Sequence, residues 1–327
     1  MRHIRQEIFS EIGKKGQLKL RNSSVAIVGL GALGSVSAEL LARAGIGKLI
    51  LIDRDVVELS NLQRQSLYDE DDLGKPKSMA AKEKLSKINH EVKIEFFIGD
   101  LSYKTIDKIL KKNKISLILD CTDNLETRFL INDFSVKNNL PFIYSSAVGS
   151  KGYVFNIMPG ETACLGCFIK ELTSLDACDT TGVLNSITHL ISSVQSNEAI
   201  KILSNKNYEK SLLFFDIWKN ELMKIKINKN EKCECCKKKN FEYLSGKKSS
   251  RIIKLCGNNI YQIKSKSMNK KQFGSLKNKL SKIGRLVDFS YCISFENKIT
   301  IFEDGRALVK AKGEKEAKSL YSRFVGN

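Results

Sequence analysis

The feature that most constrains the fold is a glycine-rich turn directly after a continuous apolar run. Val25 to Val28 form the run, and Gly29-Leu-Gly31-Ala-Leu-Gly34 follows it. An unbroken apolar run bounded by glycine predicts a parallel strand that is buried on both faces. The glycines let backbone N–H groups approach phosphate at a helix start, where the helix dipole favours negative charge. The pattern therefore predicts a Rossmann-like βαβ unit that binds an adenine nucleotide.

The next predicted strand ends on a carboxylate that suits the ribose of a nucleotide. Residues 49–52 form a second apolar run, and Asp53 closes it 24 residues after Gly29. A carboxylate in this position can accept hydrogen bonds from ribose hydroxyl groups. By itself this fingerprint is typical of NAD binding, so an NAD-dependent dehydrogenase is one interpretation. A turn that needs positive φ at glycine is the structural alternative.

Strand-like and helix-like segments alternate along the first half of the chain. The predicted strands cover residues 25–28, 49–52, 92–98 and 115–119, and the predicted helices cover residues 36–44, 76–88 and 105–112. This order of elements predicts a doubly wound α/β fold with a largely parallel sheet.

Beyond Tyr144 the pattern changes to short strands around one long helix. The predicted strands cover residues 152–157, 212–216 and 223–227, and the helix carries Ile187, Leu190, Ile191 and Val194 on one face. Residues 228–239 are polar and rich in lysine apart from their cysteines, so we place a domain boundary after Lys239. Residues 1–239 then form the first domain, and residues 240–327 form a small α+β module.

Composition excludes several classes of protein. With 42% hydrophobic and 28% charged residues, the 327-residue chain is typical of a globular protein and not of a disordered one. No run approaches the ~20 apolar residues of a membrane span, and no signal peptide opens the chain. The odd count of nine cysteines argues against a secreted disulfide framework. We therefore expect a cytoplasmic protein without membrane association.

The net charge of +19 is unevenly distributed along the chain. Residues 1–230 carry a net charge of +5, whereas residues 231–327 carry +14. A basic surface attracts RNA or an acidic protein, so that expectation applies only to the last third of the chain. Lysine also favours solubility, which is the alternative explanation of this charge.

Three polar elements follow predicted strands, at the edge where open α/β sheets bind ligands. Arg64 offers a planar fork for phosphate, and Lys77 offers a point charge just inside a helix start. Asp123 can hold magnesium through its carboxylate, with waters and phosphate oxygens completing the shell. A triphosphate attacked at phosphorus needs such groups, whereas a dinucleotide does not. Together they favour ATP, although each residue alone fits an ordinary solvated loop equally well.

Four cysteines form two closely spaced pairs. Cys164 and Cys167 make the first pair, and Cys233 and Cys236 make the second. Four thiolates form a closed tetrahedral zinc site, so the pairs predict structural zinc. Cys235 makes the register of the second pair ambiguous, and four unrelated free cysteines are the alternative.

Taken in order, these motifs resemble those of the ubiquitin-activating-enzyme superfamily, in its ThiF/MoeB/HesA group. The resemblance runs from about Arg2 to Cys236. It is carried by Arg2–Gln6, Gly29–Gly34, Asp53–Gln65, Gly74–Lys77, Asp120–Asn124, Cys164–Cys167, Cys178 with Gly182-Val183, and Cys233–Cys236. Two residues depart from the family pattern, since Ala32 stands where glycine is frequent and His90 where proline is usual.

The resemblance implies ATP-dependent adenylation of the C-terminal glycine of a ubiquitin-like sulfur carrier that ends in Gly-Gly, with release of pyrophosphate. Asp53 would hold the ribose. Asn61, Arg64 and Lys77 would hold the phosphates, and Asp123 would serve the magnesium side of the transition state. A separate protein would donate the sulfur.

The resemblance also implies two roles outside the nucleotide loops. Arg5 matches an arginine that reaches into the nucleotide site of the neighbouring subunit, which implies a homodimer. Cys178 matches a cysteine that links covalently to the carrier in some members and is dispensable in others.

Several alternatives stay open at this point. Within the superfamily, dehydration of a threonylcarbamoyladenosine in tRNA is the second enzymatic interpretation, although those relatives generally lack the paired cysteines. A zinc-stabilised RNA-binding scaffold is the non-enzymatic one. Carriers for thiamine, molybdopterin, tRNA thiolation and protein conjugation all remain candidates. Residues 240–327 fall outside the catalytic resemblance and receive no role.

Overall fold

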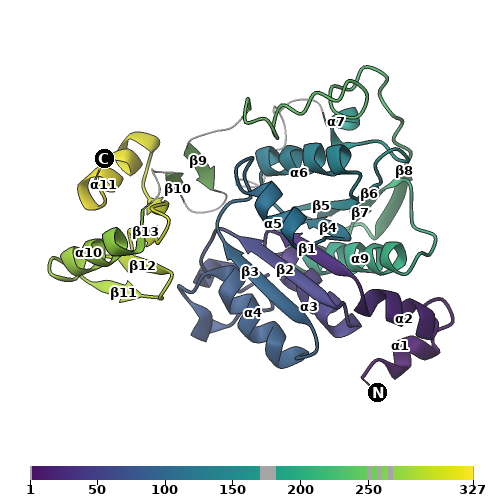
Figure 1. The fold of residues 1–327 in the computed structure, drawn as a ribbon, viewed down its shortest axis with the longest axis horizontal. Helices are drawn as coiled ribbons and strands as arrows, with labels where there is room; N and C mark the ends of the chain where they lie inside the picture. The colour runs from purple at the N-terminus through teal and green to yellow at the C-terminus, as the bar shows by residue number, and fades with distance from the viewer. Residues whose placement is uncertain (1, 170–181, 249–251, 256–258, 264–267, 327) are drawn as a thin grey trace. The chain divides into compact units, whose positions relative to one another are not determined.

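An eight-stranded sheet organises most of the chain, with the strand order β3-β2-β1-β4-β5-β6-β7-β8 (Figure 1). The parallel strands are β1 (Ser24–Val28), β2 (Lys48–Asp53), β3 (Lys93–Ile98), β4 (Leu117–Asp120) and β5 (Phe142–Val148). The antiparallel strands that extend the sheet are β6 (Lys151–Ile157), β7 (Leu212–Asp216) and β8 (Glu221–Ile225). The predicted α/β class with a largely parallel sheet is confirmed.

The computed structural model describes residues 2–169, 182–248, 252–255, 259–263 and 268–326. The chain divides into two compact units. The first comprises Met1–Leu73 with Lys77–Lys248, and the second comprises Gly74–Pro76 with Ser249–Asn327. Among the described helices, none is both long and apolar enough to cross a membrane.

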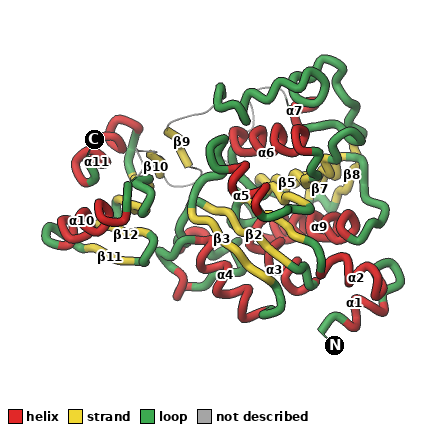
Figure 2. The backbone as a smooth tube through the Cα atoms, in the orientation of Figure 1, coloured by secondary structure: helices red, strands yellow, loops and turns green. Residues whose placement is uncertain are grey.

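Helices cover both faces of the eight-stranded sheet, as Figure 2 shows by the strands lying between helices. One face packs against α3 (Gly34–Ala44), α4 (Lys77–Ile88) and α9 (Asn185–Leu203), and the other against α5 (Ile106–Lys112), α6 (Leu125–Asn138) and α7 (Leu165–Phe168). Successive strand residues point to opposite faces. Val25 and Ile27 therefore join one core, and Ala26 and Val28 join the other. Burial on both faces explains why the run is apolar without alternation.

Strand order reverses around β1, which lies between β2 and β4. Val28 at the end of β1 is opposite Ile52 of β2 and Asp120 of β4. The loops that follow these three strands therefore leave the sheet at the same level and at its topological switch point. Open α/β sheets bind their ligands at that edge.

A short segment beyond the predicted boundary at Lys239 packs on the first unit. The backbone N–H groups of Tyr243 and Leu244 donate to Asp133 Oδ2 at 3.0 and 3.2 Å. The Tyr243 ring also stacks on Phe129, with the two ring centroids 5.0 Å apart. These contacts explain why the first unit extends to Lys248.

The second unit contains a six-stranded antiparallel sheet with the order β11-β12-β13-β14-β10-β9. Its elements are β9 (Ile252–Leu255), β10 (Ile260–Ile263), α10 (Lys270–Ser281), β11 (Leu286–Asp288), β12 (Cys292–Phe295), β13 (Ile299–Phe302), β14 (Ala307–Lys310) and α11 (Glu314–Phe324). Leu280 of α10, Ile293 of β12 and Ala317 of α11 are fully buried in a common apolar cluster, so this unit has a core of its own.

Candidate active site

The glycine turn after β1 is shaped by close backbone contacts. Gly29 has φ of +87°, a conformation that favours glycine. A Cβ atom on Gly34 would lie 1.8 Å from the Gly29 carbonyl oxygen, so no larger residue fits there. A Cβ on Gly31 would meet only Gln65 Nε2, at 3.7 Å. No side chain caps the start of α3, so its first turn leaves N–H groups for an anion.

Asp53 is tied to this turn by backbone hydrogen bonds. The N–H of Leu30 donates to Asp53 Oδ2 at 2.5 Å, and the N–H of Asp55 donates to Oδ1 at 2.7 Å. Burial raises the pKa of Asp53 to about 6. The carboxyl group lies directly beside the loop that the sequence predicts to hold phosphate.

Lys77 lies at the same edge of the sheet, as the first residue of α4. It is buried, and its Nζ is 3.6 Å from Asp55 Oδ2. Arg64 is partly exposed and donates to the Ser60 carbonyl oxygen at 3.0 Å within its own loop. Asn61 ends a short 3-10 helix in that loop, Leu59–Asn61. Burial lowers the pKa of Arg64. Arginine is so basic that the guanidinium keeps its charge all the same.

Asp123 follows β4 and contacts an arginine to which the sequence analysis assigned no role. Arg54 Nη2 is 3.6 Å from Asp123 Oδ1, and Arg54 Nη1 is 3.3 Å from Asp100 Oδ1. Arg54 directly follows β2, and Asp100 is the second residue after β3. Both residues could have been predicted as members of the site, because polar residues that follow parallel strands gather at one edge of the sheet.

A buried arginine holds the loop that carries Asp123. Arg128 on α6 donates to the Thr122 carbonyl oxygen at 3.2 Å and to the Tyr144 hydroxyl at 3.1 Å. The Thr122 N–H donates to Asp120 Oδ1 at 3.0 Å, and burial raises the pKa of Asp120. The loop is therefore fixed at its base, while the Asp123 side chain is 51% exposed.

The donor set at this edge fits magnesium. Magnesium prefers carboxylate oxygens and waters in combination with substrate phosphates. The network of ion pairs described above contains more carboxylates than cations. Its acidic members are Asp55, Asp100 and Asp123, and its basic members are Arg54 and Lys77.

The four predicted cysteine ligands meet in one cluster. Their Sγ atoms all lie within 4.8 Å of one another, and the contacts from Cys164 to Cys167, Cys164 to Cys233, and Cys167 to Cys236 measure 3.8, 3.6 and 3.4 Å. A tetrahedron with Zn–S bonds of about 2.3 Å has edges of about 3.8 Å. The cluster therefore fits zinc. Cys235 is not one of the four and accepts a hydrogen bond from Asn132 Nδ2 at 3.2 Å, which favours Cys236 over Cys235 in the second pair.

One predicted site residue, Arg5, is not brought to these loops, and a second falls in the part of the chain that the structure does not describe. Cys178 lies outside the described residues. Arg5 is exposed on α1 (Ile4–Ile8), where the neighbouring Gln6 donates to the carbonyl oxygen of Ala44 at 3.0 Å. Ala44 is the last residue of α3, which begins at the glycine turn, and 11 residues of helix span about 16 Å. Arg5 therefore lies near the opposite edge of the sheet from its own chain's nucleotide loops.

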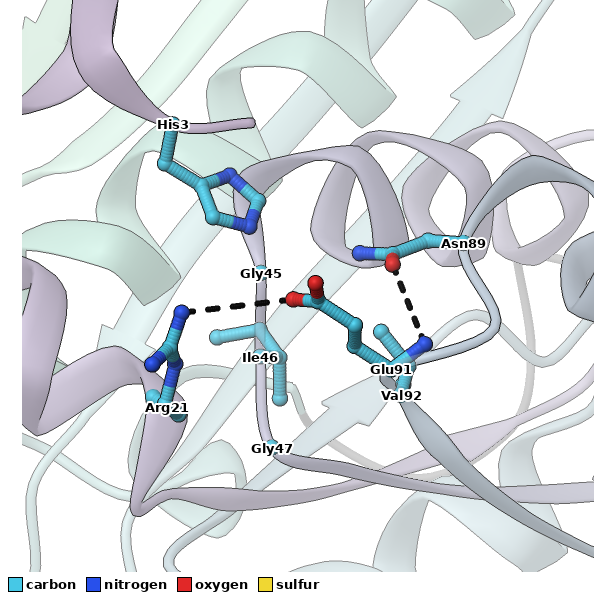
Figure 3. Close-up of a pocket in the computed structure, with 8 residues that line it drawn as sticks. All are labelled: His3, Arg21, Gly45, Ile46, Gly47, Asn89, Glu91 and Val92. Atoms are coloured by element: carbon cyan, nitrogen blue, oxygen red, sulfur yellow. Dashed lines mark hydrogen bonds and ion pairs between the residues drawn. The ribbon is translucent and has the colours of Figure 1, made fainter. Parts of the chain in front are cut away.

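A cavity of about 290 Å³ lies at that opposite edge (Figure 3). Gly47 and Val92 in its wall immediately precede β2 and β3, which places it at the amino ends of these strands. His3, Arg21 and Glu91 face the cavity, and Arg21 is 3.9 Å from Glu91. The cavity is thus separate from the predicted nucleotide site.

The fold and the switch-point loops define an α/β nucleotide-binding protein with a cluster of four cysteines that fits a metal ion. The chain belongs to the ThiF family, whose family model matches residues 3–235. It is 38% identical over 335 residues to the sulfur carrier protein ThiS adenylyltransferase of Bacillus subtilis (strain 168), with 99% of each chain covered. That alignment includes both units.

Two further comparisons each cover 72% of this chain. The sulfur carrier protein ThiS adenylyltransferase of Escherichia coli (strain K12) is 34% identical over 239 residues, which cover 72% of this chain and 94% of that protein. The crystal structure of E. coli MccB with MccA-N7isoASN has a TM-score of 0.65 at 22% identity, over 72% of this chain and 75% of MccB. The structural likeness supports the same fold.

Proposed function

We propose that this protein adenylates the C-terminal glycine of a ubiquitin-like sulfur carrier with ATP and releases pyrophosphate. The observation that carries the proposal is the joint position of the glycine turn, Asp53 and the Lys77 and Asp123 ion pairs at one edge of the sheet. The relative in B. subtilis, matched along its whole length, bears the name of a ThiS adenylyltransferase and supports a ThiS-like carrier.

The resemblance to the ThiF family, together with this arrangement, supports the following nucleotide contacts. Asp53 would accept hydrogen bonds from the ribose, and the N–H groups at the start of α3 would receive phosphate. Asn61, Arg64 and Lys77 would hold the remaining phosphate oxygens. Asp123 would hold magnesium, which supplies positive charge to the phosphate oxygens when it is bound.

The reaction itself needs little covalent chemistry from the protein. The carrier's terminal carboxylate attacks the α-phosphorus of ATP, the bond to the β-phosphate oxygen breaks, and pyrophosphate leaves. A carboxylate is a weak nucleophile, so the chain must hold it in line with the phosphorus. Arg64 and Lys77 would stabilise the negative charge that develops on the phosphate oxygens.

Two alanine substitutions in the glycine turn should separate folding from nucleotide binding. Gly34→Ala places a Cβ against the Gly29 carbonyl and should destabilise the fold by about 3 kcal/mol or more. Gly31→Ala meets no close neighbour, so it should alter stability by less than about 0.5 kcal/mol and still weaken ATP binding at least about tenfold. Thermal melts and calorimetric titration with ATP would measure the two effects. Normal ATP affinity in Gly31→Ala would argue against phosphate binding at this turn.

We also propose a homodimer in which Arg5 enters the site of the second copy. About 16 Å of helix separates the region of Arg5 from its own chain's glycine turn, which favours a contribution in trans. The same helical hairpin, α1 with α2 (Gly13–Arg21), exposes apolar side chains that a partner copy could cover. They are Ile4, Ile8, Phe9 and Leu18, and the exposed fractions of Ile8 and Phe9 are 67% and 56%.

We propose that Cys164, Cys167, Cys233 and Cys236 bind structural zinc. Four thiols are packed together, and the contact with Cys164 raises the pKa of Cys167 to about 12. A divalent cation would offset the charge of the thiolates and release their protons. The site would join the segment after β6 to the segment after β8, which are far apart in sequence.

Loss of one ligand should remove the metal and destabilise the first unit. Cys233→Ser should abolish stoichiometric zinc and lower the melting temperature by roughly 10 °C, because a lost structural metal costs several kcal/mol. Cys235→Ser is the matched control, since its thiol lies outside the cluster, and it should retain zinc. Metal analysis and melts would check both variants. Zinc retained in Cys233→Ser and lost in Cys235→Ser would reverse the assignment of ligands.

Exchange of labelled pyrophosphate into ATP tests the proposed function. The full chain should catalyse exchange only with a carrier that ends in Gly-Gly, and a carrier lacking its terminal glycine should be inactive. The dehydrogenase interpretation instead expects thermal protection by NAD and none by ATP with magnesium. Thermal protection by NAD alone, combined with no carrier-dependent exchange of pyrophosphate, would contradict the proposed adenylation activity.

A further inference from the structure

Arg54 lies where the ends of three strands converge. It follows β2 directly, whereas Asp100 follows β3 and Asp123 follows β4. The Arg54 guanidinium is 3.3 Å from Asp100 and 3.6 Å from Asp123. One side chain therefore links three loops at the edge that carries the proposed nucleotide site.

The strand register places this link across the end of β1. Ile52 of β2 and Asp120 of β4 are both opposite Val28, the last residue of β1. Neighbouring strands are about 4.8 Å apart, so β2 and β4 are separated by about 10 Å. The ion pair between Arg54 and Asp123 spans this interval, and the glycine turn begins directly after Val28 between the two strands. The guanidinium thus lies beside the proposed phosphate site.

Burial differs sharply between Asp100 and Asp123, two of the carboxylates that pair with Arg54. The side chains of Arg54 and Asp100 are 9% and 11% exposed, whereas that of Asp123 is 51% exposed. Burial disfavours the charged guanidinium, but Asp100, Asp55 and Asp123 outweigh it and raise the pKa of Arg54 above its usual value. The buried pair with Asp100 is screened little by solvent and anchors the arginine. The exposed carboxylate is the partner that needs to be held in one orientation.

We infer that Arg54 is a positioning residue for the magnesium site of the proposed adenylation reaction, and the inference rests on that proposed function. Anchored on Asp100, Arg54 holds Oδ1 of Asp123 and leaves the second carboxylate oxygen to the metal. Groups that orient a metal-binding carboxylate strengthen metal binding, and their loss typically weakens it about 10–100-fold. Arg54 itself touches neither ATP nor the carrier in this role.

Metal affinity is the readout that tests the inference. Arg54→Lys retains the positive charge, but a single ammonium group cannot form the two separate contacts of the guanidinium. Binding of Mn²⁺ to the full chain, in the presence of a non-hydrolysable methylene analogue of ATP, would be measured by electron paramagnetic resonance. We expect the variant to bind Mn²⁺ about 10–100-fold more weakly, with unchanged affinity for the analogue in the absence of metal. Excess magnesium should restore pyrophosphate exchange towards the wild-type rate.

Two further variants make the test specific. Asp100→Asn removes the anchor without altering Arg54 or Asp123, and it should weaken Mn²⁺ binding in the same direction. Arg43→Lys alters an arginine on α3 that pairs with Glu39 at 2.8 Å on the surface, and it should bind Mn²⁺ normally. If Arg54→Lys fails to fold, Asp100→Asn decides the question.

The opposite results would overturn the inference. Wild-type Mn²⁺ affinity in both Arg54→Lys and Asp100→Asn would show that Asp123 needs no support. Weaker binding of the analogue without metal would make Arg54 a direct phosphate ligand instead. Mn²⁺ binding requires neither carrier nor turnover, so absence of pyrophosphate exchange in the wild-type chain would reject the proposed function while leaving this test valid.

Discussion

Replacing Arg64 with alanine should lower carrier-dependent pyrophosphate exchange by about 10²–10³-fold, because the variant loses a cation that stabilises charge on the transferring phosphate. The Arg64 side chain is partly exposed and donates to Ser60 within its own loop, so its removal should leave the fold intact. The measurement is kcat for exchange at saturating ATP and carrier, combined with the melting temperature.

The surface arginine on α3 provides the control for this experiment. Arg43→Ala removes an equal charge from an exposed pair with Glu39 and should retain full exchange. A loss in Arg64→Ala of less than about fivefold, with normal stability in both variants, would contradict a role for Arg64 in the transition state.

The second large effect concerns the proposed contribution of Arg5 in trans. Arg5→Ala and Asp123→Ala should each be inactive as homodimers, because every site lacks one group. A mixed dimer of the two contains one complete site, formed by Asp123 of one copy and Arg5 of the other. Random mixing should therefore restore about a quarter of wild-type exchange, given an isologous two-fold dimer.

Activity of the mixed dimer distinguishes a role of Arg5 in the partner's site from a role in the site of its own chain. If Arg5 served its own chain, both sites of the mixed dimer would be defective and mixing would restore no activity. Sedimentation or light scattering on the same samples would establish that dimers form and exchange subunits. Activity of Arg5→Ala alone at the wild-type level would also contradict the proposal.

Elements with strong local patterns were predictable from the sequence. The helix from residue 36 ends at Ala44, where Gly45 adopts the left-handed conformation with φ of +82°, and the strand at residues 212–216 is found as expected. Both have clear apolar periods and clear end signals. The residues within and next to these two segments determine their structure, so a single sequence is sufficient to predict them.

Other elements depend on tertiary contacts and were missed or displaced. Helix α6 buries polar residues such as Arg128, Asn132 and Asp133 along with its apolar ones, so its sequence has no clean amphipathic period. Strand β8 occupies residues 221–225 instead of the predicted 223–227, and all five residues are exposed. Without burial on one face, nothing in the sequence fixes where such a strand begins.

The site was predictable only in part. Asp53 and Lys77 could be placed because each occupies the end of one element. The contacts of Arg54 with Asp100 and Asp123 require the order β3-β2-β1-β4, which brings together residues almost 70 positions apart. No local pattern contains that information. The choice between Cys235 and Cys236 likewise needed three-dimensional coordinates, since both follow Cys233 closely.

The mass of the carrier after reaction tests the central claim most directly. A purified ThiS-like carrier would be incubated with the full chain, ATP and magnesium, and its intact mass measured at once. We expect a carrier heavier by one AMP group, attached to the terminal glycine and absent when that glycine is deleted. An unmodified carrier, or AMP attached elsewhere on it, under conditions where the chain binds ATP, would contradict the account.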